Sequence, residues 1–226
     1  DVQSVLRVLE GCFAHSIDHP SAHSKFNTTD KRQYVVERPE LLRHLIKATK
    51  KYPKIKLHFN TSLIGINKWN KEITVQNLKT KKLSTISCDF VIGADGVNSL
   101  TRTLAHQGQD AHFSHEFLTW RYKQVRIPLK TIQGFGWDEK SEHFVHSKTG
   151  GVLIAFPNAD KSYTGMFLLP EKGEHTFEKL TTKTKVMNFL KEQFPKQEQA
   201  FDLFLTAILN NPEGTLRTID VNPLYD

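Results

Sequence analysis

The chain has 226 residues with a net charge of +7, and 38% of them are hydrophobic. A chain of this length buries about 70% of the surface that it exposes when unfolded, enough for one large domain or two smaller ones. The composition argues against disorder, and no apolar run approaches the roughly 18 residues that cross a bilayer. The sequence therefore predicts a globular protein without a transmembrane segment.

The cysteines and the charge pattern exclude several further classes of protein. Cys12 and Cys88 are too few and too far apart for a disulfide framework or a zinc site, so we expect a reducing compartment, cytoplasmic or mitochondrial. Lysines cluster at 47–56 and 79–82, where they predict solvated faces. Basic and aromatic residues do not alternate as they do in proteins that bind single strands, so we expect no nucleic-acid partner.

The first segments of the chain predict a helix and a loop. Apolar residues recur at helical spacing over residues 2–9, and Gly11 ends the pattern. Three histidines then follow at intervals of four: His15, His19 and His23. Pro20 and the polar surroundings argue against a helix there, and hence against a metal site.

Residues 34–59 predict a strand, a helix and a second strand. The strand covers residues 34–36, and the helix begins near Arg38 with Pro39 in its first turn. Five apolar side chains form its predicted buried stripe: Leu41, Leu42, Leu45, Ile46 and Ala48. Residues 55–59 alternate as a half-buried strand does.

Most of the remaining chain predicts antiparallel strands. A β-meander is predicted from three short segments: 62–69, 72–78 and 83–87. Longer alternating strands are predicted at 112–128, 142–145, 151–156 and 162–169, with one apolar face formed by Phe144, Leu153, Ala155, Phe167 and Leu169. Two amphipathic helices, 183–193 and 199–209, and a strand at 215–221 complete the pattern.

The stretch from Cys88 to Arg102 predicts a strand, a tight turn and a helix. Residues 90–92 are β-branched or aromatic, Gly-Ala-Asp-Gly at 93–96 ends the strand, and Asn98 or Ser99 can cap the helix that follows. Ligands in α/β folds bind where such strands end. Asp95 would point into that crevice, with Arg102 holding the helix against the turn. The alternative is that Asp95 merely caps the turn.

The spacing Asp-Gly-x-x-Ser-x-x-Arg at 95–102 resembles the second fingerprint of the single-component flavoprotein hydroxylases, which contacts both FAD and NADPH. Other segments resemble the kynurenine 3-monooxygenase branch of that family: Arg-Pro-Glu-Leu-Leu at 38–42, Tyr-Lys-x-x-x-Ile-Pro at 122–128, and Ala-Phe-Pro-Asn-x-x-Lys-Ser-Tyr-Thr at 155–164. The resemblance covers nearly the whole chain. It implies aromatic-ring hydroxylation with FAD as cofactor and NADPH as a transient reductant.

The resemblance also implies an α/β (α+β) fold. It places part of a Rossmann-like FAD-binding domain at residues 1–108, an antiparallel substrate-binding sheet at 109–212, and a return to the first domain at 213–226. The chain would be a central fragment, because neither the GxGxxG loop nor the last Gly-Asp fingerprint is present. The implied cofactor residues are Arg38, Leu63, Asp95, Gly96 and Arg102. No catalytic acid or base is implied, because the flavin supplies the chemistry.

The sequence departs from this branch where the substrate carboxylate would bind. Cys12 stands in place of an arginine, and Phe26 in place of a tyrosine. A pocket of five residues, Cys12, Phe26, Phe144, Leu153 and Phe167, would favour a neutral aromatic over kynurenine, since burying an unpaired carboxylate costs several kcal/mol. Arg121 or Arg126 is the alternative partner for that carboxylate. A second interpretation is a non-catalytic structural or interaction subunit that retains this fold and binds a partner subunit.

Overall fold

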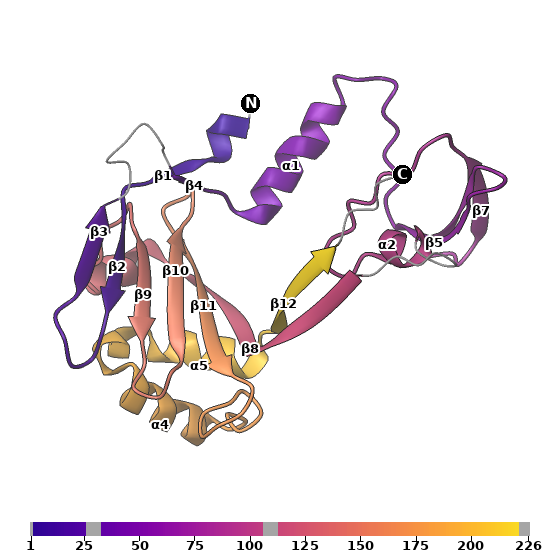
Figure 1. Ribbon diagram of the computed structural model, residues 1–226. Coiled ribbons are helices and arrows are strands. Elements are labelled where there is room, and N and C mark those ends of the chain that lie inside the picture. The colour runs from indigo at the N-terminus through magenta and orange to yellow at the C-terminus, as the bar shows by residue number, and fades with distance from the viewer. Residues whose placement is uncertain (1, 26–32, 106–112, 222–226) are drawn as a thin grey trace. The chain divides into compact units, whose positions relative to one another are not determined.

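The computed structural model describes residues 2–25, 33–105 and 113–221, and the chain divides into two compact units (Figure 1). The first unit comprises residues 1–51 and 118–216, and the second comprises residues 52–117 and 217–226. Residues 1–51 group with the later part of the chain, because strands from the first 25 residues pair with strands of the later sheet. The domain boundaries at 108 and 212 stay a prediction. Within the described residues no helix has the length and hydrophobicity that crossing a bilayer requires.

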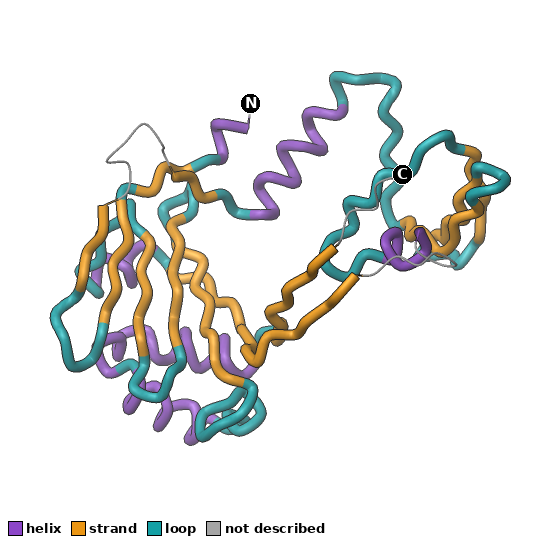
Figure 2. Tube along the Cα trace, viewed as in Figure 1, coloured by secondary structure: helices purple, strands orange, loops and turns teal. Residues whose placement is uncertain are grey.

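A seven-stranded sheet, in the order β12-β8-β11-β10-β9-β2-β3, lies largely in the first unit (Figure 2). Its strands are β2 (Gly11–His15), β3 (Ala22–Lys25), β8 (Phe113–Ile127), β9 (Glu142–His146), β10 (Val152–Pro157), β11 (Tyr163–Pro170) and β12 (Glu213–Val221). β2 runs parallel to β9, whereas β3 pairs antiparallel with β2, and β8, β11, β10 and β9 form a continuous antiparallel array. The strands predicted for the later part of the chain are thereby confirmed.

Helices cover one face of this sheet. They are α3 (Leu129–Gly134), α4 (Lys183–Gln193), η2 (Pro195–Ala200) and α5 (Phe201–Asn210), and they confirm both predicted amphipathic helices. The core lies between them and the sheet, with Phe167 of β11 fully buried at its centre. The ring of Phe167 meets the rings of Phe194 and Phe204 edge-on, with centroids 5.5 and 5.0 Å apart. Such aromatic contacts add to the burial of a large apolar area.

The strand register separates residues that the sequence placed on one face. Leu153 lies opposite both Val145 and Phe167, whereas Phe144 lies opposite Ile154. Because successive side chains of a strand point to opposite faces, Phe144 and Leu153 face opposite ways. The prediction of one shared apolar face is therefore wrong for Phe144.

The face of the sheet that carries Phe144 is mostly half-buried, and we call it the open face. Its half-buried members are Cys12, Ala14, Glu142, Phe144, Val152, Ile154, Phe156, Thr164 and Met166, and Leu168, opposite Val152, is buried on the same face. On the helix face, by contrast, the side chains of Leu153 and Phe167 are 0% exposed. The two faces thus have different roles: one builds the core, and the other remains accessible.

The N-terminal segment forms a short 3₁₀ turn, η1 (Val2–Val5), and a strand, β1 (Arg7–Leu9), so the helix predicted over residues 2–9 is wrong. β1 pairs antiparallel with β4 (Gln33–Val35), and this distant partner outweighs the local helical spacing. The helix predicted from Arg38 is confirmed as α1 (Arg38–Thr49). Its predicted buried stripe is wrong, because no residue of α1 is buried and Leu42 is 55% exposed.

The second unit contains a three-stranded antiparallel meander, as predicted. Its strands are β5 (Thr61–Asn67), β6 (Glu72–Asn77) and β7 (Leu83–Ser87), and α2 (Leu100–Ala105) follows. The strands predicted at residues 55–59 and 90–92 are wrong, since both segments are exposed and lie outside every strand. A strand needs a hydrogen-bonding partner, and the described residues offer none to either segment.

Candidate functional site

The Asp95 carboxylate closes the turn that precedes α2. Its Oδ1 accepts a hydrogen bond from the Ser99 hydroxyl, and its Oδ2 accepts from the Thr101 amide at 2.9 Å and the Thr101 hydroxyl at 3.0 Å. These bonds, with Ser99 contributing most, hold the pKa of Asp95 far below its usual range. Asp95 is therefore ionised at neutral pH, and it makes the capping contacts that were the alternative prediction.

The local sequence dictates this turn. Gly96 adopts a φ of +81°, a left-handed conformation that glycine tolerates best. A Cβ at Gly93 would lie 2.9 Å from Cγ2 of Thr101, so the close approach of turn and helix requires a glycine there. The Ser99 hydroxyl accepts from the Arg102 amide at 2.9 Å, and the Arg102 guanidinium donates to the Val97 carbonyl at 2.8 Å. Arg102 thus holds the helix against the turn, as predicted.

A hollow of about 560 Å³ lies beside this turn. Its lining is Val91, Gly93, Ala94, Asp95, Gly96, Ser99, Thr101, Arg102 and Ala105. The Asp95 carboxylate that faces this hollow already accepts hydrogen bonds from Ser99 and Thr101. Because an ionised carboxylate only accepts hydrogen bonds, a ligand group that meets it must be a hydroxyl or amine donor, whereas a phosphate would be repelled. This acceptor therefore suits the hydroxyl-bearing part of a dinucleotide.

The open face of the first unit carries a second group of candidate residues. Cys12 lies directly opposite Glu142 in the parallel register of β2 and β9, and burial together with the Glu142 carboxylate raises the pKa of the Cys12 thiol. Ala14 and Phe144 form the next pair along the same strands. A half-buried apolar surface thus begins beside one thiol and one carboxyl group, and a flat ring could pack there.

The profile of the FAD binding domain family matches residues 8–211. The chain belongs to this family. It is 29% identical to the kynurenine 3-monooxygenase of Salinispora arenicola over 83% of the chain and 41% of that relative. It is 32% identical to the Legionella pneumophila (strain Lens) enzyme of the same name, over 84% of the chain and 41% of the relative. The Dictyostelium discoideum kynurenine 3-monooxygenase is 27% identical over 100% of the chain and 48% of its own length.

Solved structures show the same fold at low sequence identity. The tetrameric form of 2-methyl-3-hydroxypyridine-5-carboxylic acid oxygenase matches with a TM-score of 0.71 at 12% identity, over 99% of this chain and 56% of that one. Tetracycline destructase Tet(55) matches with a TM-score of 0.59 at 16% identity, over 97% and 54%. The α/β fold class is confirmed, and the chain spans less than half the length of these three curated relatives.

Only some of the predicted cofactor residues of this chain lie close together in the structure. Asp95, Gly96 and Arg102 share the turn and line its hollow. Leu63 is half-buried on β5 and does not line that hollow, and Arg38 is exposed at the start of α1 in the other unit. A role of Arg38 or Leu63 toward FAD therefore stays a prediction.

The predicted substrate residues separate in the same way. Cys12 and Phe144 lie on the open face, whereas Leu153 and Phe167 are fully buried beneath the helices. The pocket that joined all of them is therefore wrong, because alternation along the strands sends Leu153 and Phe167 into the core. Phe26 lies outside the described residues.

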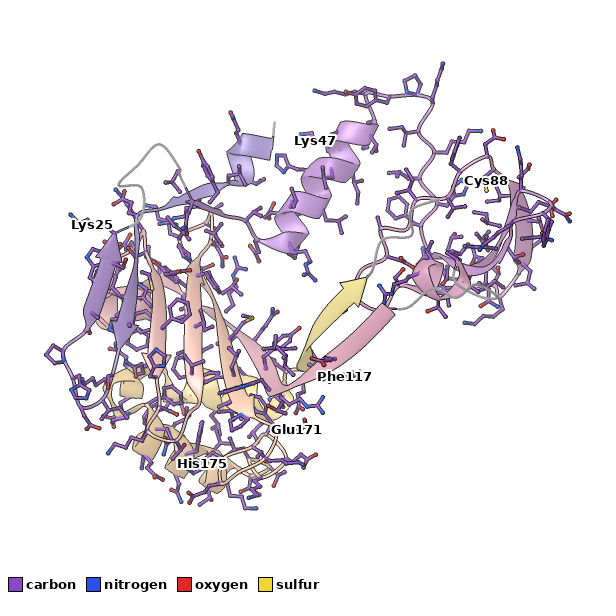
Figure 3. All side chains as sticks on the ribbon, viewed as in Figure 1. Lys25, Lys47, Cys88, Phe117, Glu171 and His175 are labelled. Carbon is purple, nitrogen blue, oxygen red and sulfur yellow. The ribbon has the colours of Figure 1, made fainter. Side chains whose placement is uncertain are left out.

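Neither predicted carboxylate partner on β8 is free. Arg126 donates to Glu37 at 2.7 Å and to Asp160 at 2.5 Å, so its charge is already balanced by two carboxylates. Arg121 pairs at 2.5 Å with Glu171, which lies just after β11 (Figure 3). An incoming carboxylate would have to compete with these partners for the guanidinium donors.

The Pro-Asn turn between β10 and β11 has a structural role. The Asn158 amide donates to the Ser162 hydroxyl at 3.0 Å, and the Thr164 hydroxyl donates to the Asn158 side-chain oxygen at 3.1 Å. The Arg7 guanidinium donates to the Asn158 carbonyl at 2.6 Å, which fastens β1 to this turn. Asn158, at the centre of the motif that most favoured the resemblance, therefore closes a turn, and its side chain is engaged within that turn.

No local pattern in the sequence indicated that the half-buried His15 meets the buried His143 in the first unit. Nε2 of His15 lies 2.9 Å from Nδ1 of His143, and Nε2 of His143 lies 2.9 Å from the Asp138 carbonyl. Since a carbonyl only accepts, His143 carries its proton on Nε2 and accepts from His15 on Nδ1. Burial lowers the pKa of His143 to about 4. No cluster of three or more metal-ligating side chains occurs in the parts of the chain that the structure describes.

Proposed function

We propose that the chain is part of an FAD-dependent aromatic hydroxylase that takes its electrons from a reduced nicotinamide cofactor. The proposal follows from its resemblance to the kynurenine 3-monooxygenases. The observation that supports this most is the family match across residues 8–211, which includes the Asp95 turn and its hollow. We expect the protein in a reducing compartment, the cytoplasm or the mitochondrion.

The proposal assigns different tasks to the two units. In the second unit Asp95 would accept a hydrogen bond from a hydroxyl group of FAD, with Gly96 and Arg102 keeping the turn in place. When bound, FAD supplies the activation of oxygen, and the protein positions the reactants and excludes water. In the first unit Cys12 and Phe144 of the open face would contact the aromatic substrate.

The test is the FAD affinity of Asp95→Ala in the full-length protein. A hydrogen bond to a charged group is worth about 1.5–3 kcal/mol, so we expect the FAD dissociation constant to rise at least about tenfold, with the fold retained by circular dichroism. Asp89→Ala is the matched control, because Asp89 lies on the same segment and forms only a loose pair with Lys71, 3.6 Å away. If Asp95→Ala unfolds the protein while the folded fraction binds FAD with unchanged affinity, Asp95 only caps the turn and has no role in FAD binding.

A second candidate is a non-catalytic subunit that keeps the fold. It is favoured by Cys12, which replaces the arginine of the resembled branch, and by the occupied guanidiniums of Arg121 and Arg126. The absorbance spectrum of the full-length protein separates the two. Flavin bands near one equivalent per chain would support the hydroxylase, and their absence after incubation with FAD would support the subunit.

A further inference from the structure

Cys12 and Glu142 form the polar end of the open face. They are register partners on the parallel strands β2 and β9, so the Cys12 thiol and the Glu142 carboxylate are neighbours on the same face of the sheet. Burial raises the pKa of both groups, and each side chain is half-buried. The carboxylate is therefore partly removed from water while it remains at an accessible surface.

No basic side chain of the described residues forms an ion pair with Glu142. The basic residues of the surrounding strands and turns are engaged elsewhere. Arg126 binds Glu37 and Asp160, Lys140 binds Glu10 at 2.8 Å, and Arg7 donates to backbone carbonyls. A half-buried carboxylate whose charge no basic side chain offsets favours a ligand that brings a donor or a positive charge.

The surface beside Glu142 is apolar. Ala14 pairs with Phe144, and Phe144 pairs in turn with Ile154, so three apolar side chains follow the polar end across neighbouring strands. An aromatic ring packed on this strip would reach Glu142 with a substituent at its edge. A carboxylate substituent would meet a second carboxylate there, and like charges at short distance repel.

We propose that Glu142, beside Cys12, determines the specificity of the open face and selects aromatic compounds that carry an amine in place of a carboxylate. This inference rests on the proposed hydroxylase function, which makes the open face a substrate surface. An arginine at the Cys12 position would favour a ligand with a carboxylate, because a guanidinium attracts it. Glu142 has the opposite preference, because it repels a carboxylate.

The test compares two ligands that differ by one carboxylate. Calorimetry on the full-length protein measures the binding of kynuramine, an aromatic amine, and of kynurenine, which carries a carboxylate as well. We expect kynuramine to bind at least tenfold more tightly, and Glu142→Gln to reduce that preference at least tenfold. Glu174→Gln removes one negative charge from an exposed loop and should leave the preference unchanged.

The inference is overturned if kynurenine binds as tightly as kynuramine, if neither ligand binds, or if Glu142→Gln behaves as the Glu174→Gln control does. Should Glu142→Gln fail to fold, the preference of the unaltered protein still decides. Flavin absorbance and ring hydroxylation, measured on the same samples, test the hydroxylase separately. An amine preference without flavin would refute the hydroxylase alone, and hydroxylation with a kynurenine preference would refute the role of Glu142 alone.

Discussion

The two units differ in how they use apolar side chains. Every buried apolar side chain of the described residues belongs to the first unit, where Phe167, Phe189 and Phe204 are at most 2% exposed. In the second unit, Trp69 is 96% exposed and Phe90 is 88% exposed. Since burial of apolar area is the dominant stabilising contribution, the first unit carries a core of its own, and the second is held mainly by backbone hydrogen bonds.

This difference matters for function. The Asp95 turn owes its shape to local hydrogen bonds and two glycines, and Ser99 is the only buried residue near it in the described part of the second unit. Regions with few buried contacts open at low free energy, and ligand-binding segments are often of this kind. We therefore expect cofactor binding to stabilise the second unit more than the first.

The largest expected effect is the removal of a core ring. Phe204→Ala should destabilise the first unit by about 3–5 kcal/mol, because the loss of transfer energy is compounded by a cavity beside Phe167. Phe90→Ala is the counterpart in the second unit and should change stability by about 0.5 kcal/mol or less, since its ring is already exposed. Urea unfolding followed by far-ultraviolet circular dichroism measures both. Equal losses would contradict the contrast between the units.

The next effect is a loss of stability of the first unit between pH 6.5 and pH 4. Burial lowers the pKa of His143 to about 4, against about 6.5 in an unfolded chain, so the unfolded state binds more protons between these values. The contribution of neutral His143 to the free energy of unfolding should be fully present above pH 6.5. The free energy of unfolding should then fall by roughly 3 kcal/mol as the pH drops to 4. His15, whose pKa is also lowered by burial and by Lys196, acts in the same direction, and Asp138 responds only at lower pH.

Unfolding curves at pH 7 and pH 4.5 measure this dependence. His143→Gln removes the titrating group and should flatten it, whereas His146→Gln, at the exposed end of the same strand, should leave it unchanged. If the free energy of unfolding of His143→Gln still falls as steeply between pH 7 and pH 4.5, another group is responsible for the acid sensitivity.

The smallest expected effect compares two strand glycines. A Cβ at Gly165 of β11 would lie 2.7 Å from Cγ1 of Val125, so Gly165→Ala overpacks the core and should cost about 1–3 kcal/mol. A Cβ at Gly65 of β5 would meet only Thr74, at an ordinary 3.5 Å, and Gly65→Ala should lie within about 0.5 kcal/mol of the parent. Thermal unfolding of both variants provides the comparison. A Gly65→Ala loss as large as that of Gly165→Ala would show that the second unit is packed as tightly as the first.

The sequence by itself determined the elements whose signals are local. Alternation along β8 to β11, the apolar periodicity of α4 and α5, and the glycines at 93 and 96 each predict the structure that forms. The contact of Arg102 with the turn was also predictable, because it depends on spacing within a single helical turn and its cap. The family resemblance followed from these same segments.

Only the tertiary structure decided which distant residues meet. Strand register sent Phe144 to the open face and Leu153 to the core, and the parallel pairing of β2 with β9 set Cys12 beside Glu142. It also joined His15 to His143, residues that lie 128 positions apart. The physical reason is that a strand has two equivalent faces, and the choice between them depends on partners that local sequence does not encode.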